Sequence, residues 1–156
     1  MLNLLFFASL LCLVYSDFNN DCLTAHNNFR ISERKPLLQL NDMLLKWSKK
    51  RALEMAEKCV FDHNGNTGSG YGENIAYGLS DCAEIVAKWN SEKELYDKTK
   101  PIYTPETANY TQITWRDTRY VGCSIANTAE ECRFNSVTVC NYYKPGNKEG
   151  QFSDNV

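Results

Sequence analysis

The sequence lacks the long apolar runs of a membrane protein once its first residues are passed. The one apolar run, residues 4–14, is shorter than the roughly 20 residues that span a bilayer and has the length of a signal-peptide core. Val14 and Ser16 suit the positions before a signal-peptidase cut, so residues 1–16 are predicted to be a signal peptide. The remainder, 17–156, is predicted to be a single secreted domain without a membrane span.

An excess of charge of one sign is also lacking, because 17 Lys and Arg stand against 19 Asp and Glu. The basic run Lys49-Lys50-Arg51 has no aromatic residue interleaved with it. Nucleic-acid sites combine a basic surface with aromatic side chains that stack on bases, so the run is interpreted as the solvated face of a helix. No nucleic-acid partner is expected.

Common hydrolase motifs are absent, since the chain contains neither a GxSxG nucleophile elbow nor an HExxH zinc helix. Histidine itself is scarce, with His26 and His63 as the two copies in the sequence. A catalytic zinc site generally needs three protein ligands and a water. The motifs therefore do not indicate a standard hydrolase.

Cysteine, by contrast, is abundant enough to suggest a disulfide framework. Cys12 falls in the predicted signal peptide, and the remaining cysteines are Cys22, Cys59, Cys82, Cys123, Cys132 and Cys140. In a secreted chain such a set indicates three disulfides, with fifteen connectivities open. No close CxxC pair occurs, which argues against a zinc cluster, and complete pairing would leave no thiol nucleophile.

Helical patterns come first along the predicted domain. The sequence predicts helices over 21–32, 42–59 and 80–97, and a short fourth helix that begins after Thr104-Pro105. Asn41 and Asp81 are the predicted N-caps of the second and third helices. The segment 61–78 is rich in glycine and asparagine and is predicted to be a long loop.

Strand patterns come last. The segment through Val121, Cys123 and Ile125 alternates in polarity, and residues 136–143 are rich in β-branched and aromatic side chains. Helices followed by strands predict an α+β domain, either segregated or layered as an αβα sandwich.

Glu92 lies at an unexpected place in the third predicted helix. At 100° per residue it falls within about 20° of Ile85, on the apolar face. A buried carboxylate needs a partner. Either Glu92 reaches solvent from the edge of the buried face, or it points into a polar site.

Seven motifs resemble, in order, those of the CAP superfamily, which includes cysteine-rich secretory proteins, antigen 5 and plant pathogenesis-related proteins. They are AHNNFR, CVFDH, GYGENIAYG, WNSE, NYTQITW, YVGCSIA and VTVCNYYKPGN. They cover nearly the whole predicted domain, and within the superfamily the chain resembles secreted venom-allergen-like proteins of parasitic worms. The resemblance implies a three-layer αβα sandwich and the disulfides Cys59–Cys132, Cys123–Cys140 and Cys22–Cys82.

The resemblance also implies a cleft in which two histidines and two glutamates can hold a divalent metal. His63, Glu73 and Glu92 match three of these positions, and Asn109 stands where the second histidine is expected. With one imidazole left, stable zinc binding and a cofactor are not expected, although oxygen ligands could hold a harder ion weakly. We expect instead a hydrogen-bonded cluster, in which Asn109 donates to Glu73 or to Glu92.

Asn109 is also the first residue of the sequon Asn109-Tyr110-Thr111, an acceptor for N-glycosylation. A side chain that lines a cleft from a folded helix would be shielded. We therefore expect Asn109 to be unmodified.

Relatives in the superfamily bind sterols through the aromatic loop before the fourth helix, and fatty acids between the first and fourth helices. Tyr96, Ile102 and Tyr103 occupy the matching loop here. Aromatic rings with polar tips suit an amphipathic ligand, although the same side chains could equally pack the loop against the domain. The predicted ligand is a sterol or a long-chain fatty acid.

Two further functions stay open at this point. An extracellular protein, from a host or from the same organism, could bind an exposed loop such as 65–72. The alternative to a binding protein is a metal-dependent hydrolase that uses a degenerate site of His63, Glu73 and Glu92. The incomplete set of cleft residues favours a non-enzymatic protein.

Overall fold

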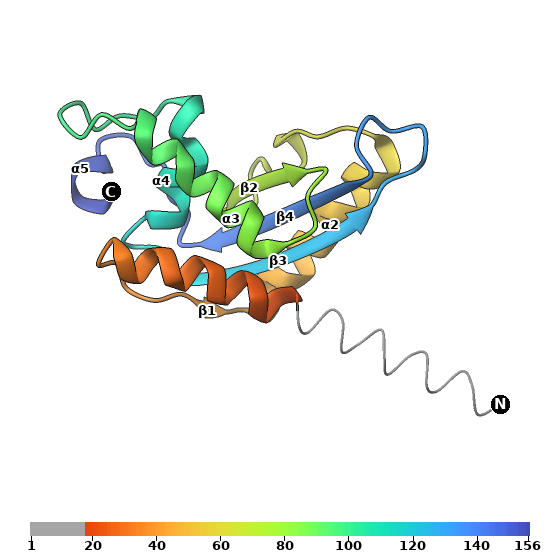
Figure 1. The fold of residues 1–156 in the computed structure, drawn as a ribbon, viewed down its shortest axis with the longest axis horizontal. Helices are drawn as coiled ribbons and strands as arrows, with labels where there is room; N and C mark the ends of the chain where they lie inside the picture. Colours follow the sequence, from red (N-terminus) through yellow and green to blue (C-terminus); the bar gives the residue numbers. More distant parts are fainter. Residues whose placement is uncertain (1–17) are drawn as a thin grey trace.

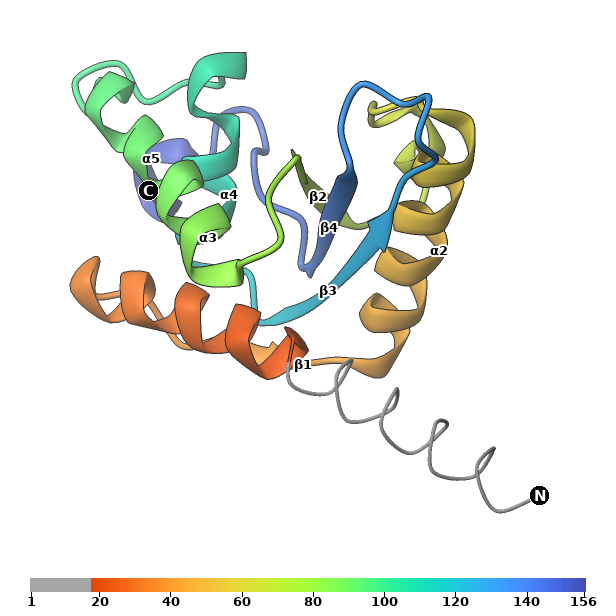
Figure 2. The same ribbon diagram turned by 45° about the vertical axis from the view of Figure 1, so that its right-hand side comes forward.

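In the computed structural model, which describes residues 18–156, one four-stranded sheet lies between two helical layers (Figure 1). One layer is α2 (Asp42–Lys58), and the other contains the first helix (residues 18–32), α3 (Cys82–Ser91) and α4 (Ala108–Thr114). Figure 2 shows α2 on one side of the strands and α3 on the other. The predicted α+β class and αβα layering are confirmed, while the predicted signal peptide, 1–16, lies outside the described residues.

The sheet has the strand order β1-β3-β4-β2. Its strands are β1 (Gln39–Leu40), β2 (Gly72–Tyr77), β3 (Tyr120–Asn127) and β4 (Ser136–Tyr143). β1 runs parallel to β3, whereas β3 and β2 both pair antiparallel with β4. Short helical elements complete the described chain: η1 (Asn64–Asn66), η2 (Glu92–Leu95), η3 (Pro105–Thr107) and α5 (Phe152–Asn155).

Alternate residues of the central strands serve two separate cores. Val121 and Cys123 of β3 pack with the first helix and α3, while Ala126 packs with α2. Gly122 faces α2 at the closest approach, because a Cβ there would lie 2.3 Å from the backbone nitrogen of Leu45. The strand alternation predicted for this segment is therefore the one that the two helical layers require.

Both predicted N-caps are confirmed. Asn41 accepts hydrogen bonds from the N–H groups of Met43 and Leu44, and Asp81 accepts one from Glu84. α2 ends at Lys58, one residue earlier than predicted, because Cys59 takes a left-handed conformation with φ of 52°. The third predicted helix is also shorter than expected, since α3 ends at Ser91 and continues as the tighter η2.

The predicted loop over 61–78 is wrong for its last third. Residues 72–77 form β2, which pairs along its whole length with β4. The glycine at position 72 reflects packing and not a turn, because a Cβ there would lie 2.1 Å from Oε1 of Gln112. The correction matters for function, since Glu73 is held on a strand.

Three disulfides connect the layers. Cys22–Cys82 joins the first helix to α3, Cys123–Cys140 crosses from β3 to β4, and Cys59–Cys132 joins the end of α2 to the loop between those strands. These are the three pairs that the resemblance implies. Within the described residues, the helices are too short or too polar to span a bilayer.

Candidate functional site

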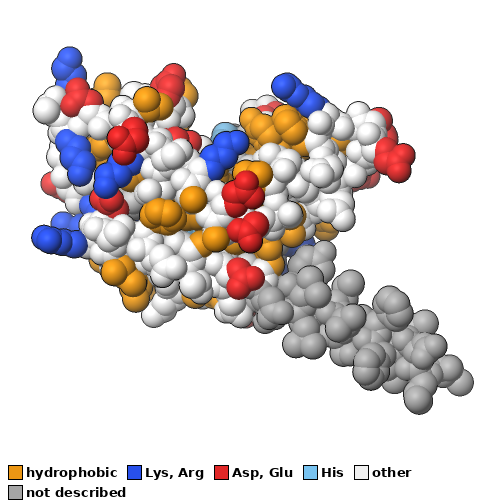
Figure 3. Space-filling model, in the orientation of Figure 1, with side chains coloured by type: hydrophobic (Ala, Val, Ile, Leu, Met, Phe, Trp, Pro, Cys, Tyr) orange, Lys and Arg blue, Asp and Glu red, His pale blue; other side chains and the backbone are white. Residues whose placement is uncertain are grey.

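A polar cleft of about 440 Å³ opens between α4 and the segment that leads into β2. Figure 3 shows the molecule notched between its two raised ends. The lining includes His63, Tyr71, Glu73, Tyr103, Asn109, Gln112 and Asn147. Glu92 is adjacent, at the point where α3 passes into η2.

The four residues singled out from the sequence form two separate pairs. Nδ1 of His63 lies 3.0 Å from Oε1 of Glu73. Nδ2 of Asn109 donates to Oε1 of Glu92 over 2.7 Å. Of the two carboxylates considered as acceptors for Asn109, the structure therefore selects Glu92.

Glu73 has a further partner that the sequence analysis missed, Arg51 of α2. Nε of Arg51 donates to Oε2 over 3.0 Å, and Nη2 donates to Oε1 over 3.2 Å. Asn141 adds a donor to Oε2 at 3.1 Å. The side chains of Glu73 and Arg51 are only 1% and 4% exposed, so this is a buried, two-point ion pair.

The pKa of Glu73 reflects this set of donors. Burial alone would raise the pKa, because it disfavours the charged carboxylate. Hydrogen bonds from His63, Arg51 and Asn141, together with the charge of Arg51, outweigh burial and hold the pKa below its ordinary value. Because an ionised carboxylate only accepts, Nδ1 of His63 carries the shared proton and Nε2 is left free of Glu73.

The interpretation of Lys49-Lys50-Arg51 as a solvated helix face is wrong for Arg51. Lys50 is exposed, but Arg51 points inward on the buried row of α2 that also contains Leu44, Ser48 and Met55. The helical spacing of that row was readable in the sequence. Its carboxylate partner was not, because Glu73 lies 22 positions further along.

The structure shows where the Glu92 carboxylate points from the apolar face of its helix. Oε2 accepts the backbone N–H groups of Asn109 and Tyr110, at 2.9 and 3.0 Å, while Oε1 accepts from the Asn109 side chain. The carboxylate thus satisfies unpaired donors in the first turn of α4. It points into the protein and is committed to holding that helix.

This arrangement does not fit a zinc site. His63 is the one imidazole in the cleft, and both oxygens of each carboxylate already accept hydrogen bonds. Zinc requires imidazole, thiolate or free carboxylate donors that converge on one point. In this cleft the carboxylates are occupied, and Nε2 of His63 alone falls short of the three protein ligands that a zinc site generally uses.

The sequon at Asn109 lies in α4, where Asn109 is half-buried. The hydroxyl of Thr111, which the sequon also needs, is buried and donates to Oδ1 of Asn147 over 2.6 Å. Both recognition side chains are therefore engaged inside the folded protein. The expectation of an unmodified Asn109 stays a prediction.

The loop before α4 places its three candidate ligand-binding residues differently. Ile102 and Tyr103 are 61% and 52% exposed and line a hollow of about 750 Å³, together with Pro101 and Phe152. Tyr96 lines an adjoining hollow that shares Pro101 and Phe152, and its ring centroid lies 5.7 Å from that of Tyr110. Phe152 was not predicted, because it reaches the hollow from the far end of the sequence.

The space between the first helix and α4 is filled at one end by Arg30. Its buried guanidinium donates to the carbonyl oxygens of Ile113 and Trp115 over 2.9 and 3.0 Å. These carbonyls belong to the end of α4, so the arginine bridges the two helices directly. A ligand could not occupy the same space.

Comparison with known proteins identifies the family of this chain. The model of the cysteine-rich secretory protein family, CAP, matches residues 23–142. Human Golgi-associated plant pathogenesis-related protein 1 is 29% identical over 144 residues, covering 89% of this chain and 92% of its own.

Two solved structures share the fold at lower identity. The crystal structure of NaASP2 with Zn²⁺ has a TM-score of 0.65 at 23% identity, covering 84% of this chain and 81% of its own. Schistosoma mansoni venom allergen-like protein 4 has a TM-score of 0.56 at 22% identity, covering 87% and 88%. On the family match, the fold and the cleft motifs, the chain belongs to the cysteine-rich secretory protein (CAP) family.

Proposed function

We propose that this CAP protein is secreted, is not an enzyme, and binds a sterol at the hollow beside Ile102 and Tyr103. The observation that supports the proposal is the exposure of two large apolar side chains, Ile102 and Tyr103, at the edge of a hollow that the 1% exposed Phe152 also lines. A volume of about 750 Å³ lies within the usual range of about 300–1,000 Å³ for small-molecule sites. Apolar side chains beside such a hollow gain free energy when a ligand covers them.

A sterol suits the site better than a long-chain fatty acid. The lining of the hollow includes Glu149, whose carboxylate can accept a hydrogen bond from a hydroxyl group. The alternative site, between the first helix and α4, contains the Arg30 guanidinium at one end. We therefore propose the loop, and not the space between these helices, as the ligand site.

Replacing Ile102 and Tyr103 together by serine should weaken the binding of a fluorescent sterol by at least about tenfold. Each side chain contributes burial worth about 1.5–3 kcal/mol when fully covered, and partial cover of two exceeds the 1.4 kcal/mol of a tenfold change. Sterol fluorescence titration measures the effect. Tyr96→Ala should change affinity little, because that ring packs on Tyr110.

The matched control is Ile31→Ser with Tyr143→Ser, since these side chains are comparably exposed but lie outside the hollow. Equal loss of affinity in both double variants, or no loss in either, would contradict the assignment of the loop. Titration with a long-chain fatty acid in parallel distinguishes the two ligand classes.

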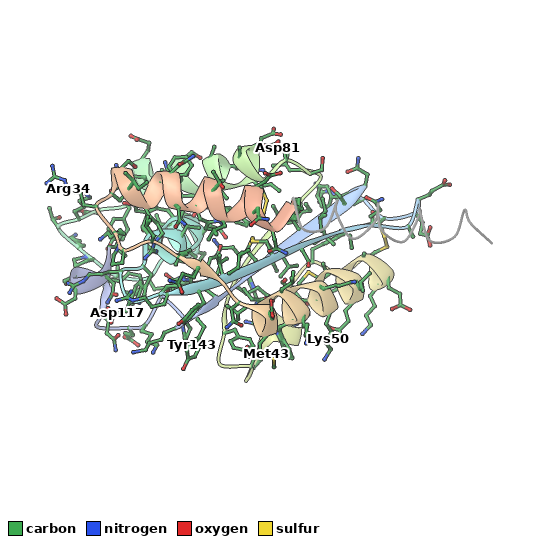
Figure 4. All side chains as sticks on the ribbon, turned by 90° about the horizontal axis from the view of Figure 1, so that it is seen from below. Arg34, Met43, Lys50, Asp81, Asp117 and Tyr143 are labelled. Carbon is green, nitrogen blue, oxygen red and sulfur yellow. A yellow bond between two sulfur atoms is a disulfide. The ribbon has the colours of Figure 1, made fainter. Side chains whose placement is uncertain are left out.

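A second candidate function, binding of an acidic extracellular protein, is favoured by a different surface. Trp47 of α2 contacts Tyr71 with ring centroids 5.9 Å apart, and Tyr71 contacts Tyr143 at 6.4 Å. Nζ of Lys50 lies 4.9 Å above the Trp47 ring. Figure 4 shows Met43, Lys50 and Tyr143 projecting outward along the same side of the molecule.

Composition points to the kind of partner. Aromatic residues and methionine are enriched in protein interfaces. The exposed part of α2 around Trp47 carries Lys46, Lys49 and Lys50, and Nζ of Lys50 also lies 3.7 Å from Glu54, so this surface has a modest excess of positive charge that attracts negative charge. The predicted recognition loop 65–72 contributes Tyr71 to this surface.

Lys46→Glu with Lys50→Glu should abolish the capture of acidic proteins from host extracellular fluid, because charge complementarity is reversed. Affinity purification followed by mass spectrometry measures it, and raised salt should reduce capture by the unaltered protein. Lys88→Glu with Lys98→Glu makes the same charge change on exposed residues elsewhere. Equal capture by all three proteins, or capture of nucleic acid or sulfated glycan alone, would contradict the proposal.

The hydrolase alternative receives no support from the geometry. His63 and Glu73 form the hydrogen-bonded pair of a general base, but Glu92 caps α4 and Glu73 is paired with Arg51. Peptide and ester hydrolysis that disappears in His63→Ala would overturn the non-enzymatic proposal.

A further inference from the structure

On the basis of the sterol site proposed above, we infer that the ligand carries a neutral sugar and that this sugar lies in the polar cleft. The cleft and the hollow adjoin, because Tyr103 and Asn147 line both of them. Their volumes, about 440 and 750 Å³, each lie within the range of about 300–1,000 Å³ for small-molecule sites. One amphipathic molecule that passes Tyr103 can therefore occupy both.

The two depressions offer different surfaces to such a molecule. Beside the hollow, Ile102 and Tyr103 expose apolar surface, so a sterol ring system gains free energy when it covers them. The cleft, in contrast, is lined by amide side chains, Asn74, Asn109 and Gln112 among them. The apolar body is therefore expected in the hollow and a polar headgroup in the cleft.

The cleft contains hydrogen-bond acceptors that the described residues leave unused. Nδ2 of Asn74 donates to the carbonyl oxygen of Asn109 over 3.2 Å, and Nδ2 of Asn109 donates to Glu92 over 2.7 Å. In the described part of the chain, Oδ1 of these two asparagines accepts no hydrogen bond. Asn74 is only 1% exposed, and a polar atom held in such a place normally has a donor. Nε2 of His63, which Glu73 leaves free, is a third acceptor while the imidazole is neutral.

These acceptors select a neutral donor of hydrogen bonds. An ammonium headgroup would need a carboxylate, but Glu73 is paired with Arg51, and Glu92 holds the first turn of α4. An anionic headgroup would bring further lone pairs against those of the amides and the imidazole. Sugar hydroxyl groups can donate to all three acceptors, while the C–H faces of the sugar ring pack on Tyr71 and Tyr103, which line the cleft. A sugar attached to a sterol therefore suits the cleft and the hollow together.

The test is competition against a fluorescent sterol, with each competitor kept below the concentration at which it aggregates. Cholesteryl β-D-glucoside should displace the probe at a concentration at least about tenfold lower than cholesterol, because its hydroxyl groups add hydrogen bonds in the cleft. Cholesteryl sulfate, whose headgroup is anionic, should bind no more tightly than cholesterol. Methyl β-D-glucoside, the headgroup without the sterol, should not displace the probe at the same concentrations.

Replacing the cleft acceptors should remove the preference for the glucoside. His63→Leu with Asn109→Ser takes away Nε2 and Oδ1, while Glu92 keeps its two backbone donors in α4. The advantage of the glucoside over cholesterol should fall by at least about threefold, while the affinity for cholesterol, whose body lies in the hollow, should stay within about twofold. Lys88→Leu with Asn28→Ser replaces exposed polar residues outside both depressions and should keep the full advantage. If the double variant does not fold, His63→Leu alone, at a side chain that is 64% exposed, should lower the advantage in the same direction.

A failed sugar site would look different from a failed sterol site. If cholesterol binds but its glucoside binds no more tightly, or if the sulfate gains as much as the glucoside, the sugar site is overturned and the sterol site stands. If the fluorescent sterol itself does not bind, both are overturned. An unchanged advantage of the glucoside in the folded cleft variants would place the sugar elsewhere. Displacement by methyl β-D-glucoside as effective as that by the whole glycoside would show that one ligand does not occupy both depressions.

Discussion

Replacing Arg30 by methionine should lower the free energy of unfolding by about 3 kcal/mol or more. The Arg30 side chain is fully buried and donates to the carbonyl oxygens of Pro36, Ile113, Trp115 and Thr118. Methionine fills a similar volume but provides no donor. Each buried carbonyl left unsatisfied costs about 1–3 kcal/mol, and the bonds to Ile113, Trp115 and Thr118 are buried.

Denaturant unfolding followed by circular dichroism measures the loss. Arg34→Met is the matched control, because Arg34 is exposed four residues further along and should change the free energy by less than about 0.5 kcal/mol. Arg30→Lys should also be destabilising, since one ammonium group cannot reproduce the fork of a guanidinium. A cost for Arg30→Met no larger than that of Arg34→Met would show that the carbonyls find other partners.

Arg30 also bears on the choice between the two lipid-binding sites that the family resemblance implies. It connects the first helix to the end of α4, and the space between these helices is where the family resemblance implies a fatty-acid site. A ligand that opened this space would separate the Arg30 guanidinium from the carbonyl groups at the end of α4. Asn109, which lines the cleft, belongs to the same helix. A ligand between the two helices would compete with the hydrogen bonds of Arg30, and for this reason we propose the hollow beside Ile102 and Tyr103 as the ligand site.

Local signals in the sequence predicted most of the helical layer. Asn41 and Asp81 cap their helices through short, sequence-adjacent hydrogen bonds, so they were readable without knowledge of the fold. The alternation of β3 was readable for the same reason, because each residue faces one of two helical layers. The resemblance to CAP proteins added what spacing could not, namely the disulfide pairing and the identity of the cleft residues.

Long-range contacts account for what the sequence could not predict. β2 is stabilised by pairing with β4, and Gly72 makes room for Gln112, so a composition typical of a loop conceals a strand. Arg51 belongs by its spacing to the buried row of α2, but the buried charge makes sense only beside Glu73. In both cases the residues that explain the feature lie far away in the sequence, so no local pattern predicts it.

Acidification from pH 6.5 to pH 4 should remove about 3 kcal/mol of stability through His26 alone. His26 is fully buried, with Nδ1 donating to the carbonyl oxygen of Cys22 and Nε2 accepting from the hydroxyl of Tyr142. Burial, aided by the positive charge of Arg30, lowers the pKa of His26 from 6.5 to about 4, although the bond to Cys22 opposes it. The neutral imidazole is therefore the native form.

The direction of the pH effect on stability follows from the number of protons that each state binds. Between pH 6.5 and pH 4 the unfolded chain protonates His26 and the folded chain does not, so each unit of acidification favours unfolding by up to about 1.4 kcal/mol. Comparing His26→Gln with the unaltered protein by chemical unfolding across this range isolates the effect, because the acid response of Glu73 is common to both. The stability gap between the two proteins should narrow by about 3 kcal/mol as the pH falls, and a constant gap would show that His26 can be protonated in the folded state.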